Sequence, residues 1–337
     1  WHCTYYDWFI YLFNAIMMRL FTKDWFQYLV ATIVILGITG VMLMFSSDQP
    51  KTSDIVSAYQ QEDYALPFKI NNPTNTYFAP KDFKEISGLT HSTDDLFYIV
   101  DDDHGDLFYY DLKSEKIIKE VDFGKNDDYE GVTVNDEYIF IVKSNGDIFF
   151  IDKNTGKVDK VETYLSKRNN IEGICYDTSS NSLLLACKGK PENKGFSPGT
   201  RCVYQFDLSI RKLKEQPYLH IVIKDEMKNL KALNLNYNFV TKVNYNSRIT
   251  RYSPSGIDID PITGDIYIVS NRGKLLTVFD KEKKLKGVYF LSEKIFGQPE
   301  GLAFDEEGNL YISNEARSTK ANILQFDRLD KIVKPKL

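Results

Sequence analysis

The chain has 337 residues, of which 43% are hydrophobic and 26% are charged, so it is not an intrinsically disordered polypeptide. Its 22 Tyr and 22 Phe favour the half-buried, pleated surfaces of β-strands. The formal net charge is −5, and no cluster of Lys and Arg with interleaved aromatic residues is present, which argues against a nucleic-acid partner.

An apolar run without charged residues spans residues 28–45. We predict a transmembrane signal anchor at residues 26–45, because a cleaved signal peptide has a shorter apolar core and a small-residue exit site. Arg19 and Lys23 precede the run, so the positive-inside rule places residues 1–25 in the cytoplasm. The sequence therefore predicts a single-pass protein of the cytoplasmic (inner) membrane, with its remainder on the periplasmic or extracytoplasmic side.

The first residue, Trp1, is not an initiator, whereas Met17 or Met18 would open a short basic segment directly before the anchor. We therefore interpret residues 1–16 either as the product of upstream translation or as the end of a fragment. After the anchor, residues 46–62 are polar and have no strand pattern, which is typical of a linker. We place the folded domain at residues 63–332, followed by a tail at 333–337.

A short glycine motif recurs five times in this domain. Each copy is followed by a short apolar strand, a Gly- or Asn-containing turn and a further strand that ends in Asp. The copies are ISGLT, EGVTV, EGICY, SGIDI and EGLAF, which begin at Ile86, Glu130, Glu172, Ser255 and Glu300. A repeat of about 40 to 45 residues with four strands is typical of a propeller blade, so we predict an all-β, five-bladed β-propeller.

Two irregularities interrupt the repeat. The last copy lacks an outer strand, and we expect the apolar segment at residues 64–70 to supply it and close the ring. The interval between the third and fourth copies is about double the others, yet residues 222–252 lack a glycine motif, so we interpret them as an insertion. In the third copy, Cys175, Cys187 and Cys202 fall on successive predicted strands, either as buried free thiols or with two of them in a disulfide.

The residue before each motif glycine should face the central axis, because the innermost strands of a propeller line its channel. These residues are Ser87, Glu130, Glu172, Ser255 and Glu300. Two positions earlier stand further polar residues on the same strand face, namely Glu85, Asp128, Asn170, Ser253 and Gln298.

Carboxylates that converge in this way repel one another unless a cation lies between them. Oxygen donors without His or Cys suit calcium, so we predict a calcium site (Ca²⁺) at the axis. We expect the ligands to come from Glu130, Glu172, Glu300, Glu315 and Asp102.

The ends of the second strands reach the same region and contribute supporting side chains beside Ser87 and Ser255. These are Lys143, Lys188, Asn271 and Arg272. Lysines offer an alternative to a metal, because Lys143 and Lys188 could neutralise Glu130 and Glu172 in an internal ion-pair network.

The segments EISGLT, DYEGV, NIEGICYD, SPSGIDIDP and GQPEGLAFDEEGNLYISNEA resemble the SdiA-regulated (YjiK-like) propeller family, over about residues 64–331. The resemblance implies a five-bladed propeller related to NHL-repeat propellers, with an N-terminal membrane segment and a bound calcium ion. Glu130, Glu172, Glu300 and Glu315 lie in the matching motifs, whereas Ser87 and Ser255 depart from glutamate. The family also resembles phytase-type and lactonase-type propellers, which are calcium-dependent hydrolases.

Two functions follow as expectations. The first is a membrane-anchored binding or scaffolding module with an axial calcium site, whose partner is a small molecule or an envelope protein. The second is a calcium-dependent hydrolase of phosphoesters or esters, in which the ion polarises the substrate and an axial carboxylate activates water. The sequence contains no GxSxG, HExxH, GxGxxG or P-loop motif, which favours the first function.

Overall fold

The computed structural model describes residues 66–80, 83, 85–192, 195–222, 247–316 and 320–329. The predicted anchor at 26–45, the linker at 46–62, the tail at 333–337 and most of the predicted insertion lie outside these residues. Within the described ranges, no helix is long and apolar enough to cross a membrane.

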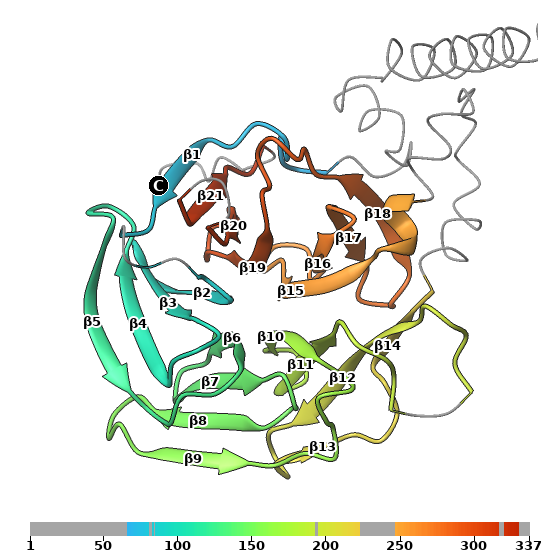
Figure 1. Cartoon of the computed structure of the whole chain (residues 1–337), viewed down its shortest axis with the longest axis horizontal. Helices are drawn as coiled ribbons and strands as arrows, with labels where there is room; N and C mark the ends of the chain where they lie inside the picture. The colour runs from blue at the N-terminus through green and yellow to red at the C-terminus, as the bar shows by residue number, and fades with distance from the viewer. Residues whose placement is uncertain are drawn as a thin grey trace, which may run out of the picture. The chain divides into compact units, whose positions relative to one another are not determined.

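Five antiparallel sheets are arranged around a central axis, as the sequence predicts (Figure 1). Each sheet is one blade. The strands of blades 1 and 2 are β2 (Gly88–Thr93), β3 (Leu96–Val100), β4 (Asp106–Asp111), β5 (Lys116–Asp122), β6 (Tyr129–Val134), β7 (Tyr138–Lys143), β8 (Ile148–Asp152) and β9 (Val158–Val161). Blade 3 contains β10 (Ile171–Asp177), β11 (Ser182–Cys187), β12 (Arg201–Asp207), β13 (Lys212–Leu213) and β14 (Leu219–Ile221). Blades 4 and 5 contain β15 (Ser253–Ile259), β16 (Ile266–Arg272), β17 (Leu275–Phe279), β18 (Leu285–Phe290), β19 (Pro299–Phe304), β20 (Leu310–Asn314), β21 (Asn322–Phe326) and β1 (Asn75–Phe78).

The innermost strands β2, β6, β10, β15 and β19 contact one another in a closed ring. Their motif glycines make this approach possible, because a Cβ atom at Gly256 would lie 2.5 Å from the carbonyl oxygen of Glu300 in the next blade. A Cβ atom at Gly88 would lie 2.7 Å from the Cα atom of Gly131. The recurrence of glycine in the sequence therefore has a steric cause, which is the close packing of the inner strands.

The hydrophobic core lies between neighbouring blades rather than in one central mass. Each blade buries both faces of its sheet against the blades on either side, so apolar strands such as Leu183–Leu185 are inaccessible to solvent. Five clusters of buried residues result, one at each junction between blades. Phe140, Phe150 and Phe206 pack at the junction of blades 2 and 3. Cys175, Cys187 and Cys202 are buried free thiols, and no disulfide joins them.

The ring is closed by an N-terminal strand, but the prediction that residues 64–70 form this strand is wrong. The closing strand is β1, which pairs antiparallel with β21 from Asn75↔Gln325 to Phe78↔Asn322. Leu66, Phe68 and Ile70 instead insert their side chains into the core between blades 4 and 5. An outermost strand of a propeller is exposed and polar, whereas the alternating apolar residues at 66–70 indicate burial, and their role is packing.

The C-terminal end of the predicted insertion packs on blade 4. A helical turn at 247–250 places the Arg248 guanidinium against Gly273, Lys274 and Leu291, to whose carbonyl oxygens it donates hydrogen bonds of 2.5 to 2.8 Å. Ile249 and Tyr252 are buried in the core between blades 3 and 4. Residues 223–246 lie outside the described residues.

The close contact at Gly256 gives a test of the ring. Gly256→Ala should lower the free energy of unfolding by about 2 kcal/mol, because the added methyl group meets the backbone of Glu300 and Leu302, which cannot rotate away. Urea unfolding followed by tyrosine fluorescence measures this loss, since the three tryptophans, Trp1, Trp8 and Trp25, lie outside the propeller. Gly297→Ala is the matched control, since a Cβ atom there meets nothing within 4 Å. Equal stability of the two variants would contradict the steric role of the glycine.

Candidate functional site

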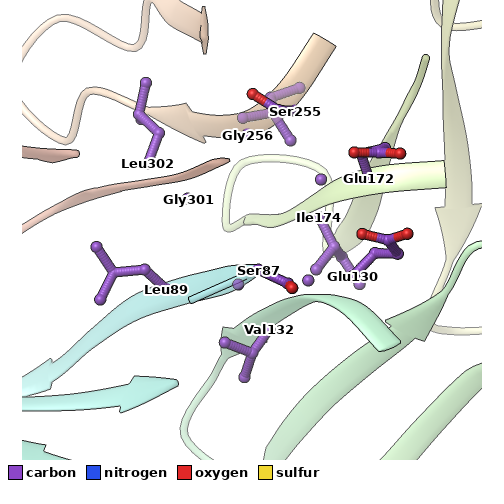
Figure 2. A pocket seen from close by; sticks show the side chains of 14 residues that line it. Ser87, Leu89, Glu130, Val132, Glu172, Ile174, Ser255, Gly256, Gly301 and Leu302 are labelled. Carbon is purple, nitrogen blue, oxygen red and sulfur yellow. The ribbon is translucent and has the colours of Figure 1, made fainter. Parts of the chain in front are cut away.

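Four of the five residues that precede the motif glycines line a narrow cavity on the propeller axis. Ser87, Glu130, Glu172 and Ser255 surround it together with the motif glycines, and its volume is about 10 Å³. This is about the room that one water molecule needs. In Figure 2 the carboxylates of Glu130 and Glu172 lie near each other on one side of the cavity, as the repeat pattern predicts.

The side chain of Glu172 is held by two partners from its own blade. Lys188 Nζ lies 2.7 Å from its Oε1 and Asn170 Nδ2 lies 2.5 Å from the same atom. Burial raises the pKa of Glu172 to about 7 even though the ammonium of Lys188 acts in the opposite direction. Burial would lower the pKa of Lys188, but the facing carboxylates more than offset it and the pKa is raised. At Lys188 the effect of the carboxylates prevails over burial, whereas at Glu172 the effect of burial prevails over the ammonium.

Glu130 differs from Glu172 because it has no hydrogen bond or ion pair with any residue that the structure describes. Burial, and then the charges of Glu172 and Asp128, raise the pKa of Glu130 well above the usual value of a carboxyl group. A carboxylate in this position lacks the compensation that burial of a charge requires. Glu130 is therefore the least satisfied acid of the axial ring.

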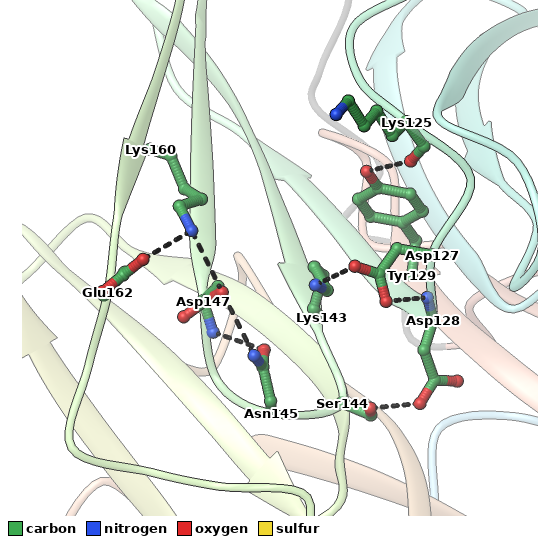
Figure 3. Close-up of polar contacts among 10 residues, drawn as sticks. All are labelled: Lys125, Asp127, Asp128, Tyr129, Lys143, Ser144, Asn145, Asp147, Lys160 and Glu162. Carbon is green, nitrogen blue, oxygen red and sulfur yellow. Dashed lines mark hydrogen bonds and ion pairs between the residues drawn. The ribbon is translucent and has the colours of Figure 1, made fainter.

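The predicted pairing of Lys143 with Glu130 is not found. Lys143 forms an ion pair with Asp127, and the neighbouring Ser144 hydroxyl donates to Asp128, so both bonds lie within blade 2 (Figure 3). Asp127 and Asp128 precede Tyr129 at the start of β6, and it is their carboxylates that contact Lys143 and Ser144 at the end of β7. The ion-pair network proposed from the sequence is thus correct for Lys188 and Glu172 and wrong for Lys143 and Glu130.

Glu300 and its supporting asparagine come from blades 5 and 4. Asn271 Nδ2 lies 3.0 and 3.1 Å from the two carboxylate oxygens of Glu300, so the amide bridges the junction between these blades. Burial raises the pKa of Glu300, and the hydrogen bond from Asn271 opposes the shift. Arg272, the other supporting residue predicted at this position, is exposed. Ser255 directs its hydroxyl to the carbonyl oxygen of Pro299 at 2.9 Å.

A second group of acids lies at the same ends of the strands in blade 1. Oxygen atoms of Glu85, Asp102 and Asp103 all lie within 4.8 Å of one another. The antiparallel register explains their meeting, since Gly88 pairs with Val100 and the residues beyond each strand end face each other. The contact with Asp102 and then burial raise the pKa of Glu85 to about 8, and Glu315 adds to the shift.

The five predicted metal ligands thus fall into two sets. Asp102 joins Glu85 and Asp103, with Glu315 in electrostatic reach, and Glu315 accepts a hydrogen bond from Gln298. Glu130 and Glu172 face the axial cavity, and Glu300 lies beside them. The sequence analysis named Glu85 as an axial polar residue and Asp102 as a metal ligand, but it did not predict that these two meet Asp103 in a group of their own, because that depends on the turn after β3.

The fold and the acidic ring define a five-bladed β-propeller whose repeated EG motifs surround the axis. The sequence profile of the SdiA-regulated family matches residues 81–317, and the chain belongs to this family. No sequence among the curated proteins matches the chain.

Solved structures resemble the chain in fold. The glutaminyl cyclase of Myxococcus xanthus superposes with a TM-score of 0.52 at 12% identity, over 76% of this chain and 95% of that chain. A luciferin-regenerating enzyme has a TM-score of 0.44 at 11% identity, over 77% and 96% of the two chains. A chain of a nidogen/laminin complex has a TM-score of 0.44 at 14% identity, over 68% and 72%. At 12% identity, the likeness to the glutaminyl cyclase shows the fold alone.

The ion pair of blade 3 yields a pH-dependent prediction. Lys188→Gln should cost about 3 kcal/mol of unfolding free energy at pH 8, because it leaves Glu172 charged and buried without its partner. The loss should shrink at pH 5. Without the ammonium, the pKa of Glu172 in the folded variant rises further above its value in the unfolded chain. At pH 5 the carboxyl group of the folded variant is protonated, so no unpaired charge is buried. The variant loses stability as the pH rises and this proton is released.

Urea unfolding at both pH values measures these differences. The matched control is the double variant Lys188→Gln/Glu172→Gln, which removes both charges and should recover most of the stability at pH 8. An equal loss for Lys188→Gln at pH 5 and pH 8 would show that the lysine stabilises the fold through packing rather than through the charge of Glu172.

Proposed function

We propose that the chain is a calcium-stabilised binding module that presents its propeller outside the cytoplasmic membrane. The observation that carries the proposal is the convergence of the oxygen atoms of Glu85, Asp102 and Asp103 within 4.8 Å. Three carboxyl groups at this distance repel one another when they are charged, and a divalent cation between them removes the repulsion.

The donor chemistry supports calcium over other metals. The group contains carboxylate oxygens without His or Cys, and Glu315 can add a further oxygen. One buried oxygen, Oδ1 of Asp102, has no hydrogen-bond partner among the described residues, although buried polar atoms nearly always have one. Hard oxygen ligands in an irregular arrangement suit Ca²⁺, whereas Mg²⁺ requires a near-ideal octahedron.

The predicted segment at 26–45 supports a placement at the cytoplasmic membrane, with the propeller on the periplasmic or extracytoplasmic side. A partner there would be a small molecule or an envelope protein that binds the face of the propeller where the acidic groups lie. In this function the ion holds blade 1 against its neighbours and shapes that face. No catalytic group is required.

A calcium-dependent hydrolase is the second candidate, and Glu130 is the observation that favours it. Its carboxylate lines the axial cavity and has no partner among the described residues. Burial, and then the charges of Glu172 and Asp128, raise its pKa to about 10, so the carboxyl group alone holds its proton at neutral pH. A cation bound beside it would lower this pKa and allow Glu130 to accept a proton. In this candidate Glu130 activates a water molecule, and a bound ion supplies the polarisation of the substrate.

Calcium binding is tested by titrating the full chain after removal of divalent ions. Calcium should raise the melting temperature, with a stabilisation of about 2.7 kcal/mol when its concentration is about 100 times Kd. Asp102→Asn and Glu85→Gln should each reduce this response strongly, because each replaces a charged ligand with a neutral one. Asp159→Asn is the matched control, since Asp159 is exposed on β9 and pairs with Arg211.

Magnesium at equal concentration should stabilise the chain less than calcium. A melting temperature that does not respond to calcium, or an unchanged response in both Asp102→Asn and Glu85→Gln, would refute the calcium site.

Hydrolysis is tested by offering the calcium-loaded full chain a panel of phosphate monoesters, carboxylic esters and lactones. If the chain is a hydrolase, turnover should fall at least 100-fold in Glu130→Gln, while the calcium-induced rise in melting temperature persists. Turnover that survives in Glu130→Gln contradicts the assigned base. Absence of turnover across the panel, with intact calcium binding, leaves the binding module as the function.

A further inference from the structure

Outside the acidic ring, a large cavity lies in blade 3, between the ends of β11 and β12. Its volume is about 850 Å³. Four basic side chains line it, and no carboxylate is among the lining residues, which is notable in a chain with a net charge of −5. The basic residues are Arg168, Lys188, Lys190 and Arg201.

Only one of these four cations is paired. Lys188 contacts Glu172, as described above, whereas Arg168, Lys190 and Arg201 form no ion pair with any described carboxylate. Glu192 follows in the same loop but does not line the cavity. Like charges that gather without counter-ions repel one another, so a bound anion would stabilise them.

The backbone beneath the basic residues is built to hold them together. The amide groups of Lys188, Gly189 and Lys190 donate to the carbonyl oxygens of residues 170, 169 and 168 at 2.9, 2.7 and 3.1 Å. A Cβ atom at Gly189 would lie 2.2 Å from the carbonyl oxygen of Arg168, so only glycine allows this approach. Asn169 is fully buried and its side chain donates to the carbonyl oxygen of Lys190 at 3.0 Å.

Arg201 forms the inner wall of the cavity. Its Nη1 donates to the carbonyl oxygen of Thr200 at 3.1 Å, and its buried Nε has no partner among the described residues. Burial lowers the pKa of this guanidinium, the direction expected when a charge is desolvated without a nearby carboxylate. The loop opposite is rich in glycine and hydroxyl groups, with Gly195, Ser197 and Gly199 on the cavity side.

We propose that this pocket, formed by Arg168, Lys190, Arg201 and the 195–200 loop, binds the phosphate group of a small phosphorylated molecule. Guanidinium and ammonium groups together match a dianionic phosphate, which accepts several charge-assisted hydrogen bonds. The cavity is far larger than phosphate alone, so the remainder of an organic molecule fits beside the glycine-containing loop. The site is separate from the acidic group of blade 1, and the proposal does not depend on calcium binding.

The test uses the full-length chain and isothermal titration calorimetry in a buffer free of phosphate and sulfate. Calcium is removed with a chelating resin, because a soluble polyanionic chelator would compete for the pocket. Glucose 6-phosphate should bind, inorganic phosphate should bind more weakly, and glucose should not bind. Gluconate, a carboxylate of similar size, distinguishes a phosphate site from a general anion site. Added sodium chloride should weaken binding, since the recognising charges are partly exposed.

Arg168→Gln and Lys190→Gln should each weaken binding of glucose 6-phosphate roughly tenfold, because each removes one charge-assisted hydrogen bond from an exposed position. Neither side chain has a hydrogen bond or ion pair with a residue that the structure describes, so both variants should keep the melting temperature of the unmodified chain. Lys212→Gln is the matched control, since Lys212 is exposed on β13 of the same blade and does not line the cavity.

Equal affinity of the unmodified chain and the Arg168→Gln/Lys190→Gln double variant would overturn the proposal. So would an equal loss in Lys212→Gln, which would indicate a response to net charge alone, or equal binding of gluconate and glucose 6-phosphate. The calcium response of the double variant reports separately on the acidic group. A failure of phosphate binding is therefore distinguishable from a failure of the calcium site.

Discussion

The close approach of five strands around one axis is the constraint on which the rest of the structure depends. Each motif glycine lets its strand lie close to the next blade, since a Cβ atom at any of the five would lie 2.5 to 3.0 Å from the nearest atom of that blade. This ring fixes the positions of the residues that precede the glycines, and four of these five residues line the axial cavity. Steric necessity therefore places Glu130 and Glu172 side by side.

Electrostatics then decides how each blade tolerates a polar residue at that position. In blade 3, the ammonium of Lys188 pairs with Glu172. The Asn271 amide of blade 4 donates a hydrogen bond to Glu300 of blade 5. At the equivalent position of blade 4, the hydroxyl of Ser255 donates to a backbone carbonyl oxygen. Blade 2 provides nothing described for Glu130, because Lys143 is already bound to Asp127. The ring is thus only partly neutralised, and burying an unpaired acid costs several kcal/mol or forces protonation. A fold that served packing alone would gain stability by replacing Glu130 with a neutral residue.

The sequence was sufficient to predict the features that recur in every blade. The predictions were wrong where the structure depends on one particular contact. Periodicity was sufficient for the number of blades, the inner ring and closure by an N-terminal strand, because each follows from five copies of one pattern. The pattern led to the wrong closing segment, residues 64–70, because alternating apolar residues are typical both of a paired strand and of a segment that packs into the core. The strand that closes the ring, Asn75–Phe78, is mostly exposed and has no such pattern. The partner of Lys143 depends on a choice between Glu130 and two nearby aspartates that no spacing rule resolves. Arg168 and Lys190 of the basic pocket lie in connections between strands, where the repeat has no register.

The two candidate sites, the acidic group of blade 1 and the basic pocket of blade 3, lie where one blade differs from the others. Five equivalent blades would give a symmetric ring, yet among the described residues it is in blade 1 that three acids, Glu85, Asp102 and Asp103, meet. The connection between β11 and β12 is longer than the corresponding connections of the other blades, and it is this connection that carries Lys190 and the glycine-containing loop. Lys188 belongs to both environments, since its ammonium contacts Glu172 while its side chain lines the basic pocket. A change in the charge of Glu172 therefore alters the field felt in the pocket, which gives the axial acids and the basic pocket a direct electrostatic connection through one side chain.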